Sequence, residues 1–338
     1  MAKTSSTKPK IALNGLGRIG RVFLRIAHNN PNFEIVALHS RSGLEMYAHL
    51  LKYDSNYGVW DKTVEVKGDN LMIDGKAIPF VTDEGQLPWK KLGVDVVVDA
   101  TGKYTKRDMA AEHLQAGARY VVTTAPMDDP DETFVFKANH EGFDPQKHQI
   151  ISAASCTTVC STLTLKVLEE SFGVERAFIN TVHAFTSDQS LQDSSHRDWR
   201  RARSATQSII PTSSGVSKTI MKIYPHLTGK ISALSLRVPV PDPSVVVLTA
   251  ILKRDATKEG LNQAFKQAAT SGLKGHLGVT DLPLVSVDFK GNSNGSTIDL
   301  SANEVVDGRL ANIIAWYDNE WGYVSQMTKL LEYICQKI

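Results

Sequence analysis

The hydrophobic and polar positions of this chain follow two successive patterns. In the first half, short apolar runs alternate with stretches of helical periodicity, beginning with an amphipathic helix expected over residues 21–29. The apolar runs lie at residues 10–14, 34–38, 94–99, 116–123 and 148–152. Short β-rich runs separated by helices predict a parallel sheet with right-handed crossover connections.

The pattern changes after Cys156. A helix expected over residues 157–172 is followed by apolar runs with polar interruptions, and the chain ends in a helical stretch at 322–338. The interrupted runs lie at residues 177–183, 231–239, 244–252, 284–288 and 312–316. Such runs predict a mixed or antiparallel sheet with one face against helices, so we place a domain boundary near Ser155.

Length and composition narrow the class of protein. The 338 residues suffice for two domains, and 42% apolar with 22% charged residues is the balance of a globular protein in water. A net charge of +2, spread along the chain, excludes a basic nucleic-acid-binding tail. No stretch approaches 18 consecutive apolar residues, and residues 1–10 are polar, so we expect neither a membrane span nor a secretion signal.

A glycine-rich turn joins the first predicted strand to the first predicted helix. Gly15, Gly17 and Gly20 form the pattern G-x-G-x-x-G. Glycines there allow a tight turn and close approach of the backbone, so that a pyrophosphate can lie on the helix N-terminus. The alternative, a turn with incidental glycines, is disfavoured because a strand precedes the pattern and a helix follows it.

The end of the second strand differs from an ordinary NAD site. That site has an Asp or Glu about 20 residues after the glycines, which binds the adenosine ribose hydroxyls. Here the chain reads His39-Ser40-Arg41-Ser42. A hydroxyl and a guanidinium would accept a 2′-phosphate that a carboxylate repels, so the sequence favours NADP over NAD. A solvated polar loop is the alternative interpretation.

Cys156 is the candidate nucleophile. It stands where a helix is expected to begin, and a helix N-terminus lowers the pKa of a thiol. His183 ends an apolar strand 27 residues later and could act as its acid and base. A buried structural cysteine and a surface histidine remain the alternative. Cys160, one helical turn on, is expected to pack, and with Cys335 the total of three cysteines favours a reducing, cytoplasmic location.

A cysteine nucleophile combined with a nicotinamide cofactor suggests a particular chemistry. An aldehyde becomes a good hydride donor once a thiolate has added to it. Formation of a thiohemiacetal, hydride transfer and release of a thioester make a consistent sequence of steps.

Six motifs in order and spacing resemble the glyceraldehyde-3-phosphate dehydrogenases. They read NGLGRIGR, SCTT, TVHAFTSDQ, RRARSATQSIIPTSSG, SLRVPVP and WYDNEWGY, and the resemblance covers nearly the whole chain from Ile11. It implies reversible oxidation and phosphorylation of glyceraldehyde 3-phosphate to 1,3-bisphosphoglycerate, with NADP or NAD and inorganic phosphate. It also implies a cytoplasmic homotetramer, with no metal, membrane or nucleic-acid partner.

The resemblance implies an α/β fold with two domains. The first is a Rossmann-type parallel-sheet domain, residues 1–155, to which a C-terminal helix at residues 319–338 returns. The second, residues 156–318, is an α+β catalytic domain with a mixed or antiparallel sheet.

The resemblance also implies roles for individual residues. Cys156 would be the nucleophile and His183 its acid–base partner. The substrate C3 phosphate would be bound by Thr186, Asp188, Arg201 and Arg237, and inorganic phosphate by Ser155, Thr157, Ser214 and Gly215. The cofactor would be bound by Asn14, Gly15, Gly17, Arg18, Ile19, Gly20, Ser40, Arg41, Thr101, Gly102, Thr124, Ser194, Ser195, Asn319 and Tyr323, with Asn319 on the nicotinamide carboxamide.

This chain departs from the family pattern in several places. Ala153 and Val159 replace two asparagines near the nucleophile, and Ser214 replaces a threonine while keeping its hydroxyl. NAD-using members tend to have Asp in place of Ser40, and Leu-Pro in place of the pair at 194–195. Small or hydroxyl residues at both places are typical of NADP-using members, so the resemblance independently favours NADP.

Three other functions are weighed against this one. Erythrose-4-phosphate dehydrogenase shares the cysteine chemistry, but Thr157, Ser214 and Gly215 retain a phosphate site that favours phosphorolysis over hydrolysis. Another phosphate-coupled semialdehyde dehydrogenase is the second alternative. Arg237, Arg201 and Thr186 indicate a phosphorylated substrate and so argue against it. An RNA-binding protein with a disabled site is disfavoured because the cysteine and histidine are both present and no basic patch stands out.

Overall fold

The computed structural model describes residues 8–82 and 87–338 and divides into two compact units. The first unit holds the described residues up to Phe134, together with His140–Ala154 and Met327–Ile338. The second holds Val135–Asn139 and Ser155–Gln326. The limits expected from the sequence, 1–155 for a dinucleotide-binding domain and 156–318 for a catalytic domain, stay a prediction. Most of the polar start, residues 1–7, lies outside the described residues.

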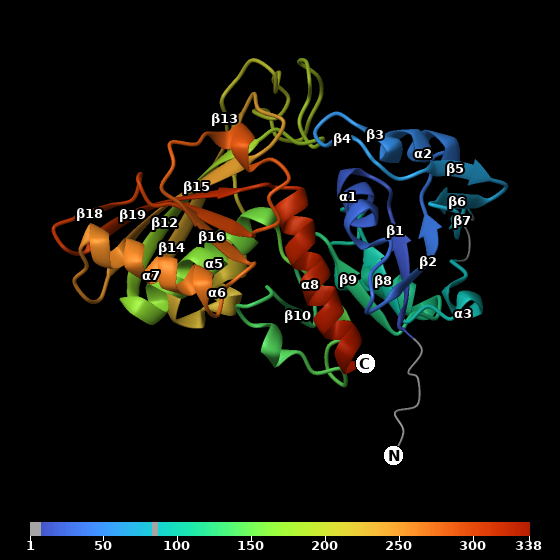
Figure 1. The fold of residues 1–338 in the computed structure, drawn as a ribbon, viewed down its shortest axis with the longest axis horizontal. Coiled ribbons are helices and arrows are strands. Elements are labelled where there is room, and N and C mark those ends of the chain that lie inside the picture. The colour runs from blue at the N-terminus through green and yellow to red at the C-terminus, as the bar shows by residue number, and fades with distance from the viewer. Residues whose placement is uncertain (1–7, 83–86) are drawn as a thin grey trace. The chain divides into compact units, whose positions relative to one another are not determined.

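A nine-stranded sheet forms the centre of the first unit, in the order β10-β11-β9-β8-β1-β2-β7-β6-β5 (Figure 1). Its strands are β1 (Lys10–Asn14), β2 (Glu34–His39), β5 (Val64–Lys67), β6 (Asn70–Ile73), β7 (Lys76–Val81), β8 (Val96–Asp99), β9 (Tyr120–Thr123), β10 (Glu132–Thr133) and β11 (Ile150–Ser152). The strands from β10 to β7 are parallel, as expected. The antiparallel edge β7-β6-β5 was not predicted.

Helices and short elements complete this unit. They are α1 (Arg18–Ala27), α2 (Leu44–Lys52), α3 (Trp89–Leu92), α4 (Arg107–Gln115), η1 (His140–Gly142), the pair β3 (Tyr53–Asp54) and β4 (Gly58–Val59), and the end of α8 (Trp321–Lys337). The prediction that the first helix begins at residue 21 was wrong, because α1 already begins at Arg18. Gly20 lies inside α1, where a Cβ would come within 2.0 Å of the carbonyl oxygen of Gly15. Glycine at that position is therefore a packing requirement and does not interrupt the helix.

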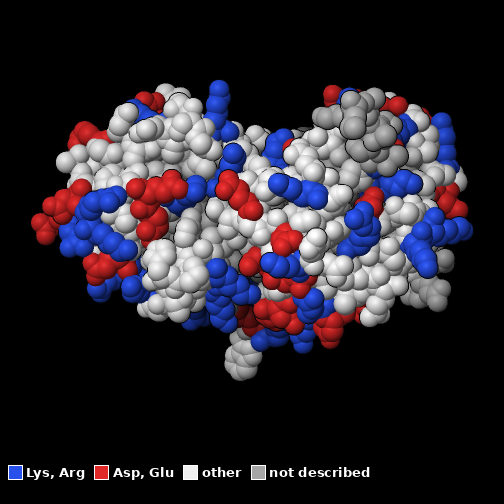
Figure 2. Space-filling model, turned by 90° about the horizontal axis from the view of Figure 1, so that it is seen from below, with Lys and Arg blue, Asp and Glu red and all other residues white. Residues whose placement is uncertain are grey.

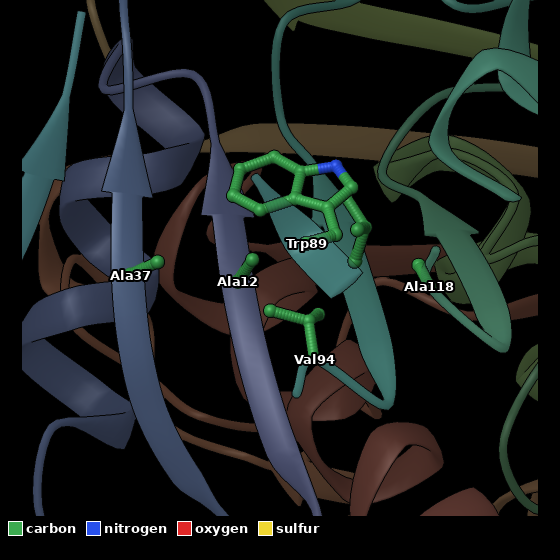
Figure 3. Packing of buried hydrophobic residues seen from close by; sticks show 6 residues of the cluster. Ala12, Ala37, Trp89, Val94 and Ala118 are labelled. Atoms are coloured by element: carbon green, nitrogen blue, oxygen red, sulfur yellow. The ribbon is translucent and has the colours of Figure 1, made fainter. Parts of the chain in front are cut away.

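The core of the first unit is built around one indole. Trp89 is fully buried, and Ala12 and Ala37 on the neighbouring strands β1 and β2 leave room for its rings (Figure 3). Val94 and Ala118 pack in the same cluster. Truncation of a buried aromatic side chain of this size costs about 3–5 kcal/mol of unfolding free energy.

The second unit contains an eight-stranded sheet, in the order β13-β14-β12-β15-β19-β17-β16, with β18 paired to β19. Its strands are β12 (Val174–Ala184), β13 (Ile210–Ser213), β14 (Ile231–Val238), β15 (Ser244–Leu252), β16 (Leu277–Thr280), β17 (Ser296–Asp299), β18 (Glu304–Val306) and β19 (Leu310–Tyr317). The pairs β12–β14 and β16–β17 are parallel and the others are antiparallel. The expected α/β class with a parallel sheet and a mixed sheet is confirmed.

One predicted strand of this unit was wrong. Residues 284–288 contain no strand but lead into a 3-10 turn, η3 (Ser286–Phe289). The carboxylate of Asp288 accepts the backbone N–H of Val285 at 2.8 Å and closes the turn. Val285 and Val287 are 59% and 60% exposed, so the apolar alternation there does not reflect burial.

The helices of the second unit are α5 (Cys156–Ser171), α6 (Val216–Ile223), η2 (Pro225–Leu227), α7 (Lys258–Thr270) and the start of α8. Helix α5 packs on β12, β15, β17 and β19 and also contacts α6 and α7. Alternate residues of β12 are buried, among them Thr181 and His183, whereas Phe178 is 46% exposed. Because side chains alternate along a strand, Thr181 and His183 lie on the face opposite Phe178.

The surface charge is mixed in sign. On the face shown in Figure 2, Lys and Arg side chains are interspersed with Asp and Glu side chains. None of the helices formed by the described residues has both the length and the apolar character needed to cross a bilayer.

Candidate active site

Cys156 is the first residue of α5. The hydroxyl of Ser155 caps this helix by accepting the backbone N–H of Thr158 at 3.2 Å. The cap leaves the thiol in the first turn, where the free N–H groups favour negative charge. The helix begins one residue earlier than predicted, so the thiol belongs to the helix itself.

The structure brings the thiol and the imidazole together. Sγ of Cys156 lies 3.4 Å from Nε2 of His183, which is the penultimate residue of β12. Strand β12 pairs with β14 so that His183 is opposite Arg237. The pairing of these strands therefore places a thiol, an imidazole and a guanidinium at one location.

Hydrogen bonds on the other side of the ring set the tautomer of His183. Nδ1 lies 2.7 Å from the carbonyl oxygen of Ala184, and Arg237 Nη1 lies 3.3 Å from the same oxygen and 2.9 Å from Nδ1. The carbonyl can only accept, and its contact with Nδ1 is the shortest of the three, so we assign the proton to Nδ1. Arg237 Nη1, which can only donate, then donates to the carbonyl and not to Nδ1. Nε2 then presents its lone pair to the thiol and can act as a base.

Burial determines the charge state of this pair. It raises the pKa of Cys156 to about 11, although the charge of Arg237 acts in the opposite direction. Burial and the charge of Arg237 together lower the pKa of His183 to about 3. At neutral pH the free protein therefore holds a thiol and a neutral imidazole. The lowering of the thiol pKa expected from the helix N-terminus is outweighed by desolvation.

Tyr317 contacts residues of both α5 and β12. It was not predicted as a site residue from the sequence. Its hydroxyl lies 2.9 Å from the hydroxyls of both Thr157 and Thr181, and its ring stands edge-on to His183 at 6.0 Å. Burial raises the pKa of Tyr317, so its hydroxyl stays neutral. The tyrosine fixes the side chain of Thr157, one of the residues expected to bind inorganic phosphate.

Two buried donors of the second unit lack acceptors among the described residues. Nε of Arg237 and Nε2 of Gln189 have no hydrogen-bond partner among the described residues. The amide oxygen of Gln189 accepts the backbone N–H of Thr186 at 3.3 Å, which leaves its Nε2 as a donor. Buried donors without acceptors are costly, and an anion such as a phosphate would satisfy them. Gln189 was not predicted as a site residue from the sequence, although it directly follows Asp188 in the TVHAFTSDQ motif.

Arg201 is held by two carboxylates. It forms ion pairs with Asp188 and with Asp198, the latter at 3.4 Å. Asp188 and Arg201 both influence the pKa of Arg237, so the three charges are neighbours. A carboxylate offers no donor to a phosphate, so Asp188 can contribute only by orienting Arg201.

Ser214 and Gly215 lie between β13 and α6. The hydroxyl of Ser214 accepts the backbone N–H of Val216 at 3.4 Å, and the carbonyl of Gly215 accepts from Thr219 at 3.3 Å. Both residues thus form the start of α6. Their predicted role in binding inorganic phosphate stays a prediction.

In the first unit, the three glycines of the turn differ in what surrounds them. A Cβ on Gly15, whose φ is +99°, would lie 2.9 Å from the backbone of Ala100, and Gly20 abuts Gly15. A Cβ on Gly17 would have no atom within 4 Å. Packing therefore requires glycine at 15 and 20, whereas Gly17 leaves open space that a pyrophosphate could occupy. The residues present fit a dinucleotide.

The start of α1 supports this fit. The helix has no side-chain cap and no acidic residue in its first turn, which contains Arg18 and Ile19. Arg18 forms an ion pair with Asp54 at 2.6 Å. Backbone N–H groups at the start of a helix that carries no acidic residue in its first turn favour an anionic ligand.

A buried polar network lies at the ends of β1, β2 and β8. The amide of Asn14 donates to Asp99 at 2.6 Å, and its oxygen lies 2.6 Å from Nδ1 of His39. Trp89 Nε1 donates to Nδ1 of His113, so Nε2 of His113 carries the proton and faces Asp99 at 3.5 Å. Polar side chains thus surround the buried carboxyl group of Asp99, and only Asn14 of this network was predicted as a site residue.

Three further cofactor candidates follow strands of the same sheet. Thr101 donates its hydroxyl to Asp99 at 2.8 Å, and the backbone N–H of Thr124 donates to the carbonyl of Asp99 at 2.9 Å. Gly102 is exposed and has a φ of +68°. The carboxyl ends of parallel strands are where α/β sheets bind ligands, so the positions of these residues suit the prediction.

Ser40 and Arg41 follow directly after β2. Ser40 is 9% exposed and donates to the hydroxyl of Tyr47 at 2.6 Å, a partner that sequence reasoning missed. Arg41 is exposed and forms no ion pair within the described part of the chain. A guanidinium without a carboxylate partner is available for an anionic group of a ligand.

The remaining cofactor candidates belong to the second unit. Ser194 and Ser195 are exposed, and the hydroxyl of Ser194 lies 2.7 Å from that of Ser190. Asn319 is buried and accepts the hydroxyl of Ser244 at 2.7 Å. Tyr323 is buried as well. Within residues 8–82 and 87–338, no cluster of three or more His, Cys, Asp or Glu side chains could hold a metal ion.

Taken together, the glycine turn of a parallel sheet and the Cys–His pair define a dinucleotide-dependent oxidoreductase. The family model "Glyceraldehyde 3-phosphate dehydrogenase, NAD binding domain" matches residues 9–107, and "Glyceraldehyde 3-phosphate dehydrogenase, C-terminal domain" matches residues 155–319. The chain belongs to the glyceraldehyde-3-phosphate dehydrogenase family.

Known relatives resemble the chain over nearly its whole length. It is 46% identical to the glyceraldehyde-3-phosphate dehydrogenase of Priestia megaterium, over 97% of this chain and 98% of that protein. It is 45% identical to glyceraldehyde-3-phosphate dehydrogenase 1 of Bacillus subtilis, also over 97% of this chain and 98% of that protein. It is 43% identical to the chloroplastic glyceraldehyde-3-phosphate dehydrogenase A of Zea mays, over 98% of this chain and 83% of that protein.

Proposed function

We propose that this enzyme reversibly oxidises and phosphorylates glyceraldehyde 3-phosphate through a thioester on Cys156, and that it prefers NADP. The observation that carries the proposal is the 3.4 Å contact between Sγ of Cys156 and Nε2 of His183. A nucleophile and a base in hydrogen-bond contact, with the base oriented by a third group, is the arrangement that activates a nucleophile.

The neutral pair suits the first chemical step. As Sγ of Cys156 bonds to the aldehyde carbon, its proton passes to Nε2 of His183, which returns it to the new alkoxide to give a thiohemiacetal. Nε2 then takes the hydroxyl proton as the carbonyl of the thioester forms. A bound nicotinamide cofactor supplies the hydride acceptor for this oxidation. Inorganic phosphate finally attacks the thioester carbon, and Cys156 leaves as the thiolate. The proton held on Nε2 of His183 then passes to this thiolate and restores the neutral pair.

The buried donors suggest how the substrate is held. We propose that Arg237 and Gln189 bind the C3 phosphate with Thr186, while Asp188 holds Arg201 beside them. Support comes from the unpartnered Nε of Arg237 and Nε2 of Gln189. The attacking phosphate would be bound by Ser155, Thr157, Ser214 and Gly215, as the family motifs imply.

The preference for NADP rests on two places in the chain. Ser40 and Arg41 stand where a carboxylate would repel a 2′-phosphate, and Arg41 is exposed without an ion pair among the described residues. The pair Ser194 and Ser195 points in the same direction through the family pattern. The test is the initial rate with glyceraldehyde 3-phosphate and inorganic phosphate, measured in parallel with NADP and NAD. A higher kcat/KM with NAD would refute the preference and leave the chemistry intact.

The thioester scheme is tested by replacing the nucleophile. Cys156→Ala should abolish turnover while cofactor binding, measured by calorimetry, is retained. Cys160→Ala is a matched control in the same helix, because Cys160 is fully buried and contacts Ser296 rather than His183. Dehydrogenase activity that persists in Cys156→Ala would exclude the thioester.

We also propose that the chain assembles as a homotetramer. The sheet face opposite α5 exposes Phe178 and Leu310, and a groove of about 710 Å³ is lined by these residues together with Thr249 and Ile251. Exposed apolar side chains grouped on one sheet face are typical of a subunit interface. Light scattering should give four times the mass of 37.1 kDa, and Phe178→Lys should lower the mass. A monomeric wild type would refute the proposal.

A further inference from the structure

The side chain of Asn319 is held in one orientation by Ser244. The hydroxyl of Ser244, the first residue of β15, donates to Oδ1 of Asn319 at 2.7 Å. The same hydroxyl accepts the backbone N–H of Ala184 at 3.0 Å. Ser244 is only 1% exposed, so its single proton needs an acceptor within the protein, and Oδ1 of Asn319 provides it.

This contact decides which end of the amide is free. Asn319 has an oxygen that only accepts and a nitrogen that only donates. With Oδ1 committed to Ser244, Nδ2 remains as the group that a ligand meets. Without the hydroxyl, rotation of the amide by 180° about its last bond would exchange donor and acceptor.

The main chain of Asn319 is held by Asp242, which lies two residues before Ser244 in the sequence. The backbone N–H of Asn319 donates to the carboxyl group of Asp242, which also shares a hydrogen bond with Asp318. The carboxylate of Asp318 accepts the backbone N–H groups of Gly291, Glu320 and Trp321 at 2.6–2.9 Å, so it carries the negative charge. Burial and the charge of Asp318 raise the pKa of Asp242 to about 9, so its carboxyl is protonated at neutral pH and donates to Asp318.

We infer that Ser244 is a positioning residue for cofactor recognition, presenting Nδ2 of Asn319 as the donor to the carbonyl oxygen of the nicotinamide carboxamide. The inference rests on the proposed function, which places the carboxamide at Asn319. Ser244 itself does not touch the cofactor.

A double-mutant cycle tests the inference, because it separates an effect through Asn319 from a general loss of structure. The variants are Ser244→Ala, Asn319→Ala and the double replacement, compared by KM for the cofactor and by kcat. Ser244→Ala should raise KM for the cofactor about threefold to tenfold, the scale of one neutral hydrogen bond. In the Asn319→Ala background the same replacement should add nothing.

Two further measurements separate positioning from misfolding. Ser235→Ala is the matched control, since Ser235 is also a buried strand serine but its hydroxyl has no partner among the described residues. It should leave KM for the cofactor unchanged. Alkylation of Cys156 by iodoacetamide without cofactor should keep its wild-type rate in Ser244→Ala, because His183 and the thiol are intact.

The outcomes distinguish the inference from the function on which it rests. If Asn319→Ala raises KM for the cofactor but Ser244→Ala does not, or if the two effects add, the positioning role is wrong and the proposed cofactor site stands. If Asn319→Ala leaves KM unchanged in a fully active enzyme, the assignment of the carboxamide to Asn319 fails, and the inference fails with it.

Discussion

Arg237 Nη1 lies 2.9 Å from Nδ1 of His183, on the side of the ring opposite the thiol of Cys156. The guanidinium lowers the pKa of His183, after burial, and also opposes the rise in the pKa of Cys156 caused by burial. A single positive charge thus favours the neutral imidazole and eases formation of the thiolate. The same side chain keeps a buried Nε without a partner among the described residues, which is the atom that we propose binds the substrate phosphate.

Replacing Arg237 by Lys should weaken binding of the substrate phosphate. Lysine keeps the positive charge but loses the planar fork of donors, so KM for glyceraldehyde 3-phosphate should rise about tenfold to a hundredfold. Steady-state kinetics with saturating cofactor measures this KM. Arg200→Lys is the control, because Arg200 is exposed and its guanidinium contacts the carbonyl of Pro211 at 3.5 Å rather than His183. An unchanged KM in Arg237→Lys would remove Arg237 from the phosphate site.

Replacing His183 by Asn should change how the reactivity of Cys156 depends on pH. Burial raises the thiol pKa to about 11, so without a base the thiolate forms only as the pH rises toward that value. At pH 7 the variant should lose turnover by about a hundredfold or more, and alkylation by iodoacetamide should be slow and increase steeply with pH. Wild-type alkylation rates at pH 7 in the variant would show that His183 is not the base.

Replacing Arg41 by Ala should reduce the preference for NADP. The 2′-phosphate would lose a charge-assisted contact, so the ratio of kcat/KM for NADP over NAD should fall about tenfold. Ser40→Asp should reduce it further, because a carboxylate repels the phosphate. Arg119→Ala is the control, because it removes a positive charge in the same unit that pairs with Asp95 at 3.0 Å. It should leave the ratio of kcat/KM for NADP over NAD unchanged. Equal ratios in Arg41→Ala and wild type would contradict the assignment.

Replacing Asp242 by Asn should flatten the pH dependence of stability. Asp242 has a pKa of about 9 when folded, raised by burial and Asp318, against about 3.9 for an unfolded chain. Between these values unfolding releases a proton, so wild-type stability falls as pH rises, by up to about 1.4 kcal/mol per pH unit. An asparagine donates to Asp318 without titrating, so that slope should largely disappear.

Urea unfolding at pH 6 and pH 8.5 measures this difference. The exposed carboxylate of Asp281 provides the control, since Asp281→Asn should leave the wild-type slope in place. Parallel slopes for wild type and Asp242→Asn would mean that Asp242 is already ionised in the folded protein.

Much of the fold follows from local patterns in the sequence. The strand expected at 244–252 is β15, Ser244–Leu252, and the strand expected at 10–14 is β1, Lys10–Asn14. Both strands were predicted from apolar runs, and in the structure many of these apolar side chains are buried. The run at 284–288 shows the limit, because its valines are exposed and a side-chain hydrogen bond of Asp288 closes a turn.

The sequence alone determined the chemical types at the site: a glycine turn after a strand, a cysteine at a helix start, and a histidine at a strand end. These signals depend on neighbouring residues and are therefore readable along the chain. Only the tertiary structure decided that Cys156 and His183 meet, because their contact requires α5 to pack on β12. It also decided the charge state of the pair, since desolvation depends on what surrounds the groups. Ser244, placed against Asn319 by the pairing of β15 with β19, carries no signal in the sequence at all.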